Sequence, residues 1–195
     1  MAKQHWKGGA LLAPVPAVMV SCGNGDIDNI ITIGWTGICS THPPKLYISV
    51  RPERFSYSLI KESGEFCVNI PSSEMVRALD WCGVRSGKDC DKFKEMKLTK
   101  EDSFAVSCKS IAECPMTLEC RVDKIIPLGS HDMFIADIVA VAVDEEIIDD
   151  KGRLMLEKAD MLAYLHGDYF TLGKKIGDFG FSVRKKKTVA KRRRK

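Results

Sequence analysis

The pattern of apolar and polar positions along the chain predicts a protein built mostly from β-strands. Short apolar or alternating runs bounded by turn residues occupy Ala17–Cys22, Asn29–Ser40, Leu46–Arg51, Phe66–Ile70, Met116–Ile126 and Met133–Val143. Asn-Gly and Gly-Asp steps follow the first run, and a Gly-Ser-His-Asp turn separates the last two. Both are hairpin signals. Strands joined by short turns favour an antiparallel barrel over a sheet with alternating helices.

The helical patterns are few and lie in the middle of the chain. We expect a short helix over Phe55–Lys61 and a second over Glu74–Cys82, whose apolar residues recur at helical spacing. A Gly-rich loop, Gly83–Gly87, then leads to a third short helix near Asp91–Met96. No Gly-x-Gly-x-x-Gly motif follows a predicted strand, which argues against a dinucleotide-binding α/β domain.

Residues suited to a nucleotide-like ligand gather where the first strands end. Thr36 and Ser40 are small hydroxyl residues that leave backbone amides approachable, and Trp35 offers a flat apolar surface. Arg51 precedes a helix that opens with Ser56, so a cation, a hydroxyl and unpaired helix N–H groups come together. A planar surface beside a phosphate site is what a nucleotide-like cofactor requires.

Charge divides the chain into two unequal parts. The segment 184–195 (RKKKTVAKRRRK) holds nine basic residues and no acidic one, so with a total of +4 the remaining residues 1–183 carry −5. We therefore expect one folded domain over 1–183 and a basic tail that is disordered in isolation. The domain does not resemble a nucleic-acid binder. Contact of the tail with nucleic acid remains an alternative that we do not favour.

Eight cysteines exclude some classes of protein. They never form a Cys-x-x-Cys pair of the kind that zinc sites use, and Asp89, Asp91 and Asp132 fit no calcium-loop spacing, so no metal site is expected. Several cysteines lie within apolar strand patterns, and the chain is too long for a small disulfide-dependent domain, so we expect mostly reduced thiols. No apolar run approaches the roughly 20 residues of a membrane-spanning helix. A cytoplasmic protein is expected.

Three segments together resemble one known family. Asn29–Pro71, Ser86–Phe93 and Gly129–Val141 are similar to the flavin reductase-like, FMN-binding split-barrel family, and above all to flavoredoxins and archaeal ferric reductases. The resemblance extends over roughly residues 7–173. It implies a mainly β fold, an antiparallel, Greek-key-like split barrel with a few peripheral helices, and FMN as the cofactor.

The resemblance also assigns roles to individual residues. The residues it places along the flavin ring and ribityl chain are Asn29, Trp35, Thr36 and Ser40. Those near the phosphate are Arg51, Ser56 and Lys92, with Ser86 beside them. His131 would approach the flavin from the turn before a long strand and act near the electron-entry face, and Tyr164 would cover the ring. Taken alone, Trp35 is more typical of a core, Arg51 of a surface ion pair, Lys92 of a solvated side chain and His131 of a turn, while Tyr164 is equally typical of a core. Only their occurrence together in this order favours a flavin site.

The family's activities leave the reaction open. One hypothesis is an oxidoreductase or electron carrier, in which bound FMN takes electrons from NAD(P)H or a reduced protein and passes them to a flavin, metal or protein acceptor. A second is a non-enzymatic FMN-binding protein that stores or senses flavin. A third is a nucleic-acid-associated protein acting through its tail. The resemblance further implies a homodimer with FMN near the subunit interface.

Overall fold

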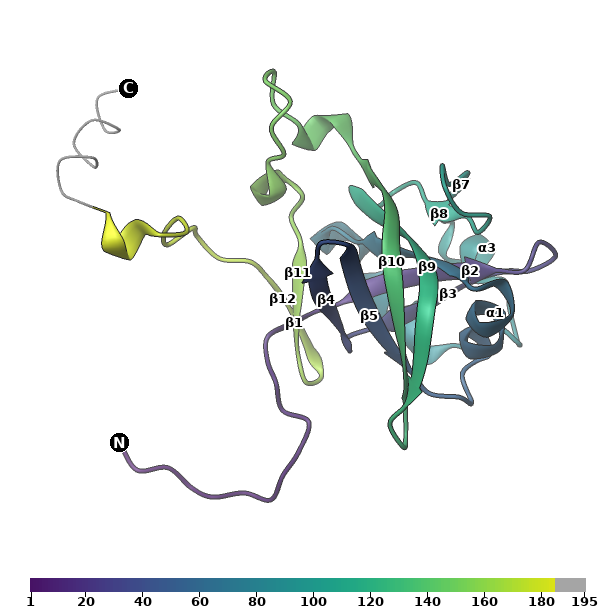
Figure 1. The fold of residues 1–195 in the computed structure, drawn as a ribbon, viewed down its shortest axis with the longest axis horizontal. Helices are drawn as coiled ribbons and strands as arrows, with labels where there is room; N and C mark the ends of the chain where they lie inside the picture. The colour runs from purple at the N-terminus through teal and green to yellow at the C-terminus, as the bar shows by residue number, and fades with distance from the viewer. Residues whose placement is uncertain (185–195) are drawn as a thin grey trace.

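A strongly curled antiparallel sheet forms the body of the protein, which the computed structural model describes over residues 1–184 (Figure 1). Its strands, in spatial order, are β3 (Asp28–Ile33), β2 (Val18–Gly23), β6 (Glu65–Ile70), β9 (Met116–Pro127), β10 (Asp132–Val143), β5 (Pro44–Val50) and β4 (Thr36–Thr41). Every neighbouring pair is antiparallel. The predicted mainly β, antiparallel barrel is therefore confirmed.

The remaining strands form two smaller sheets, which the sequence analysis did not predict. One contains β1 (Val15–Pro16), β11 (Leu162–Leu165) and β12 (Asp168–Thr171), and the other β7 (Lys100–Glu101) and β8 (Ser110–Ile111). The β11–β12 hairpin turns at His166 and Gly167, which both have positive φ, 46° and 121°. Glycine adopts such a backbone without steric cost, so this turn is locally encoded.

Three helices lie at the edges of the barrel, as expected. They are α1 (Phe55–Ser63), α2 (Val76–Val84) and α3 (Lys92–Met96), with 3-10 turns at Ser73–Met75, Glu145–Ile147, Leu156–Lys158 and Phe181–Val183. Gly64 ends α1 in the left-handed conformation, with φ 68°. The Asp91 side chain caps α3 by accepting a hydrogen bond from the Lys94 amide.

The single strand predicted over Asn29–Ser40 is wrong. The chain leaves the sheet at Gly34 and Trp35, between the end of β3 and the start of β4. The Trp35 carbonyl accepts a hydrogen bond of 2.9 Å from the Ser49 amide of β5. Because β3 and β4 are the two edges of the sheet, this break carries the chain from one edge of the curled sheet to the other.

The core has two parts because β2 and β3 are covered on both faces. Inside the barrel, Val18 and Val20 of β2 pack with Phe66 and Phe134. On the opposite face, Met19 of β2 belongs to a second cluster of side chains from β3, α2 and α3, which contains Ile30, Leu79, Cys82 and Phe93. Every residue of β2 is consequently buried. The second cluster fixes α2 and α3 against the outside of β3.

The chain ends lead away from the barrel (Figure 1). Residues 1–13 have no regular structure and are exposed, as are most of residues 172–184. The predicted basic tail, apart from Arg184, lies outside the described residues. No helix within residues 1–184 is long and apolar enough to cross a membrane.

Candidate functional site

Two adjoining cavities lie where the barrel opens between β3, the turn before α1 and the end of α2. The first has a volume of about 410 Å³ and the second about 330 Å³. Ile31, Arg54 and Gly83 line both. The two cavities are therefore neighbouring parts of one candidate site, and Arg54 stands at their junction.

Aromatic rings line the first cavity. Trp35 is half-buried at the break between β3 and β4, and Tyr164 of β11 lines the same cavity. The ring of His166 links them, with its centroid 5.9 Å from Trp35 and 6.5 Å from Tyr164. The small sheet that contains β11 thus closes this side of the cavity. The result is a set of flat apolar surfaces that suit a planar ligand.

Tyr169 and Asp80 also line this cavity, and sequence reasoning missed both. The Tyr169 hydroxyl donates a hydrogen bond of 3.1 Å to the Asp80 carboxylate. Burial and this carboxylate raise the pKa of Tyr169 to about 12, so the phenol stays protonated. The pairing of β11 with β12 brings Tyr169 beside Tyr164, a placement that only the unpredicted hairpin reveals.

His131, which the resemblance assigned to the flavin, enters the first cavity from the turn between β9 and β10. Its carbonyl accepts a hydrogen bond from the Leu128 amide, and its Nδ1 lies 2.9 Å from the Ser130 hydroxyl. Burial lowers the pKa of His131, and the nearby positive charge of Arg51 lowers it further. The imidazole is therefore mainly neutral at pH 7.

The N-terminus of α1 forms one wall of the second cavity. The helix begins after Arg54 without a side-chain cap and with no acidic residue in its first turn. Its first amides and its dipole therefore favour an anion. The buried Ser56 hydroxyl accepts a hydrogen bond of 2.8 Å from the Asn29 amide group, which fixes both predicted residues in this wall.

Gly87 allows the opposing loop to lie close to that wall. A Cβ atom at this position would come within 2.1 Å of the Asn29 Oδ1 and 2.8 Å of the Phe55 ring. Any side chain here would displace the buried pair that Asn29 forms with Ser56. Ser86, which precedes Gly87, also lines this cavity, and its hydroxyl accepts a hydrogen bond from the Lys88 amide.

Lys92 lines the second cavity but has a structural role that the sequence analysis did not foresee. Its side chain is only 3% exposed, and its ammonium group donates hydrogen bonds of 2.7 Å to the carbonyls of Ile30 and Cys82. Lys92 thus ties the end of α2 to β3. Burial lowers its pKa from the usual value. An ammonium group has three N–H donors, so one remains for a ligand.

The two arginines of the segment Arg51–Arg54 differ in their surroundings. Arg51 lines the first cavity and forms an exposed ion pair of 3.4 Å with Glu53. The Arg54 guanidinium makes no hydrogen bond or ion pair with any of residues 1–184. Sequence reasoning missed Arg54, although a second arginine directly before a helix was a usable signal. Arg54 is the cation placed between the two cavities.

Thr36 and Ser40 line neither cavity. Both belong to β4, beyond the break at Trp35, and among residues 1–184 this strand pairs only with β5. The Thr36 hydroxyl donates a hydrogen bond of 2.7 Å to the Tyr47 carbonyl. The structure therefore brings together the other predicted residues, namely Asn29, Trp35, Arg51, Ser56, Ser86, Lys92, His131 and Tyr164.

The site combines two chemical environments. The first cavity presents aromatic surfaces, a neutral imidazole and backbone groups of the Gly34 segment. The second presents a helix N-terminus, a hydroxyl and cationic side chains. Within residues 1–184, no group of three or more His, Cys, Asp or Glu side chains could hold a metal ion. A planar ring carrying a phosphate-ended chain fits this arrangement.

Comparison with known proteins gives the family. Residues 11–173 match the model of the flavin reductase like domain. The structure is similar to a flavoredoxin of Desulfovibrio vulgaris (Miyazaki F), with a TM-score of 0.87, 30% identity, and coverage of 94% of this chain and 100% of that one. A flavoredoxin from Methanosarcina acetivorans has a TM-score of 0.84, 26% identity, and the same coverage.

A third solved structure, an FMN-binding protein from Thermus thermophilus with bound 1-cyclohex-2-enone, is similar in fold. Its TM-score is 0.79, its identity is 21%, and the match covers 91% of this chain and 99% of that one. The family match takes in both cavities and every residue that lines them. The chain belongs to the flavin reductase-like split-barrel family.

Proposed function

We propose that the protein binds FMN and transfers electrons through it. Membership of the family supports a flavin cofactor. The observation that favours FMN is the junction of an aromatic-lined cavity with a cationic one at Arg54. The ring would lie between Trp35 and Tyr164, and the phosphate would meet the start of α1, with Ser56 and Lys92 near it. A structure described as an FMN-binding protein shares the fold.

His131 is the side chain that we propose to act at the electron-entry face. FMN supplies the redox chemistry, while the protein binds and orients it and keeps water from the ring. A mainly neutral His131 can donate or accept a hydrogen bond without adding charge beside Arg51. The electron donor in this proposal is NAD(P)H or a reduced protein, and the acceptor is a flavin, a metal or a protein.

The proposal is tested by the colour and the redox response of the purified protein. It should be yellow and should release FMN rather than FAD on denaturation, because the cationic cavity suits a terminal phosphate. Rapid bleaching near 450 nm in a stopped-flow experiment with NADH or NADPH would indicate a reductase. Bleaching only by a reduced protein would indicate a carrier. A colourless protein that fails to bind added FMN would contradict the proposal.

We infer that the protein forms a homodimer. Large apolar side chains are exposed on the strands and on the C-terminal segment: Ile38 of β4, Val139 and Val141 of β10, Phe170 of β12, and Leu172, Ile176 and Phe179 beyond it. Exposed apolar side chains of this kind support a twofold contact between copies. The mass of one chain is 21.7 kDa, and light scattering should give twice this value. A monomer that holds FMN would contradict this inference.

The location that we propose is the cytoplasm. All eight cysteines are free thiols, and six of them are buried. Reducing compartments keep thiols in this state, whereas secreted proteins usually convert them to disulfides.

A further inference from the structure

Two buried cysteines far apart in the sequence meet outside the candidate site. Cys67 lies in β6, and Cys108 lies in the loop before β8. Their sulfur atoms are 3.6 Å apart, and the two residues are 0% and 2% exposed. Val106 covers them in a small cluster of its own. Within residues 1–184 no other cysteine sulfur contacts a second cysteine sulfur.

Hydrogen bonds hold the loop that carries Cys108 over β6. The buried Glu119 carboxylate accepts bonds of 2.9 and 2.6 Å from the amides of Phe104 and Ala105. Glu65 accepts a bond of 2.7 Å from the Ser107 amide. These two carboxylates come from β9 and β6, so the loop is anchored to the strand that carries Cys67 and to its neighbour. The anchoring places the two sulfur atoms in contact.

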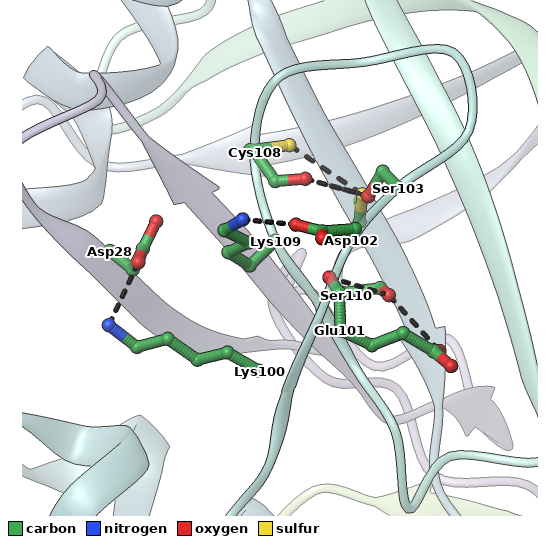
Figure 2. A network of polar contacts seen from close by, with 9 residues as sticks. Asp28, Lys100, Glu101, Asp102, Ser103, Cys108, Lys109 and Ser110 are labelled. Atoms are coloured by element: carbon green, nitrogen blue, oxygen red, sulfur yellow. Dashed lines mark hydrogen bonds and ion pairs between the residues drawn. The ribbon is translucent and has the colours of Figure 1, made fainter.

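Ser103 completes the cluster (Figure 2). Its hydroxyl donates a hydrogen bond of 2.6 Å to the Cys108 carbonyl, as Figure 2 shows. The same hydroxyl lies 3.3 Å from the Cys67 sulfur. The contact with Cys108 lowers the pKa of Cys67 and raises that of Cys108. The contact between the two sulfur atoms places either thiol to resolve what forms on the other, and we take Cys67, whose pKa is the lowered one, as the attacking thiol.

We propose that Cys67 and Cys108 form a reversible disulfide when the protein meets a peroxide-class oxidant. The Cys67 thiol gives up its proton, its sulfur attacks one peroxide oxygen and the O–O bond breaks, so that a sulfenic acid and a hydroxide form. The hydroxide takes up that proton and leaves as water. The Cys108 sulfur then attacks the Cys67 sulfur, the S–O bond breaks, and a second water leaves. Two thiols lose two electrons and two protons, and one hydrogen peroxide becomes two waters. For the bond to form, the two sulfur atoms must approach from 3.6 Å to about 2.05 Å.

The disulfide would enclose residues 68–107, which contain α2, α3 and one wall of the second cavity. Gly83, Ser86 and Lys92 belong to that segment. Closing a loop of this length restricts the unfolded chain. For a protein of this size we expect the midpoint of thermal unfolding to rise by roughly 8–16 °C. This effect does not depend on bound flavin.

The test compares the purified full chain before and after treatment with stoichiometric hydrogen peroxide. Free thiols are alkylated under denaturing conditions, and disulfide-linked peptides are mapped by mass spectrometry. We expect a peptide that links Cys67 to Cys108, the loss of two alkylation sites, and a rise in the midpoint. A dithiol reductant should reverse all three changes.

Two variants serve as a test and a control. Cys108→Ser should abolish both the linked peptide and the rise in midpoint. Cys114→Ser should keep both, because Cys114 is a buried thiol whose sulfur contacts Met75 rather than another cysteine. The proposal is overturned if the oxidised wild-type protein keeps all eight thiols, links other cysteines, or shows no rise in midpoint. The mapping of the wild-type protein decides the matter even if a variant fails to fold.

Discussion

Replacing Lys92 by methionine should lower the free energy of unfolding by about 2–4 kcal/mol, in the protein without flavin. The ammonium group donates to the carbonyls of Ile30 and Cys82, and methionine would leave both without this donor in a buried site. Each buried acceptor left unpaired costs about 1–3 kcal/mol. Loss of the buried charge offsets part of this cost. Urea unfolding followed by circular dichroism measures the change.

Lys94→Met is the matched control for Lys92→Met. Lys94 lies on the same helix, is exposed, and its side chain contributes none of these bonds. Its replacement should change the free energy of unfolding by less than about 0.5 kcal/mol. An equal loss in both variants would show that general charge, rather than the two carbonyl contacts, stabilises this region.

The strand pattern of the sequence predicted the large sheet because its strands are short apolar runs bounded by turn residues. The error over Asn29–Ser40 arose because Gly34 and Trp35 fit a strand pattern locally. What ends β3 there is the curl of the sheet, which brings Trp35 beside Ser49. The β11–β12 hairpin was missed because its strands have only four residues each, too few for a periodic signal.

In the candidate site, too, some features were predicted correctly from the sequence and others were not. The residues at strand and helix ends that the resemblance marked, such as Asn29, Ser56 and His131, do line the cavities. The direction in which a long side chain points could not be predicted from the sequence. Lys92 fits a phosphate-binding role by residue type, yet two of its donors go to carbonyls 62 and 10 residues away. Thr36 and Ser40 lie outside the site because the predicted strand breaks before them, at Gly34 and Trp35.

Replacing Arg54 by alanine should weaken the binding of FMN by about 1.5–3 kcal/mol, or roughly 10- to 150-fold. Arg54 lines both cavities and makes no side-chain bond to the described residues. Its guanidinium is therefore available for a charge-assisted hydrogen bond to a phosphate. Arg51→Ala should cost less, because Arg51 already pairs with Glu53. Fluorescence titration of the apoprotein with FMN measures both changes.

Riboflavin, which has the same ring and no phosphate, separates this role of Arg54 from a general effect on the site. If Arg54 contacts the phosphate, Arg54→Ala should leave riboflavin affinity unchanged and abolish most of the preference for FMN. Arg77→Ala, an exposed arginine of α2 that lines neither cavity, should leave both affinities unchanged. Equal losses for FMN and riboflavin would instead mean that Arg54 supports the ring cavity. The phosphate would then depend on the start of α1 and on the remaining donor of Lys92.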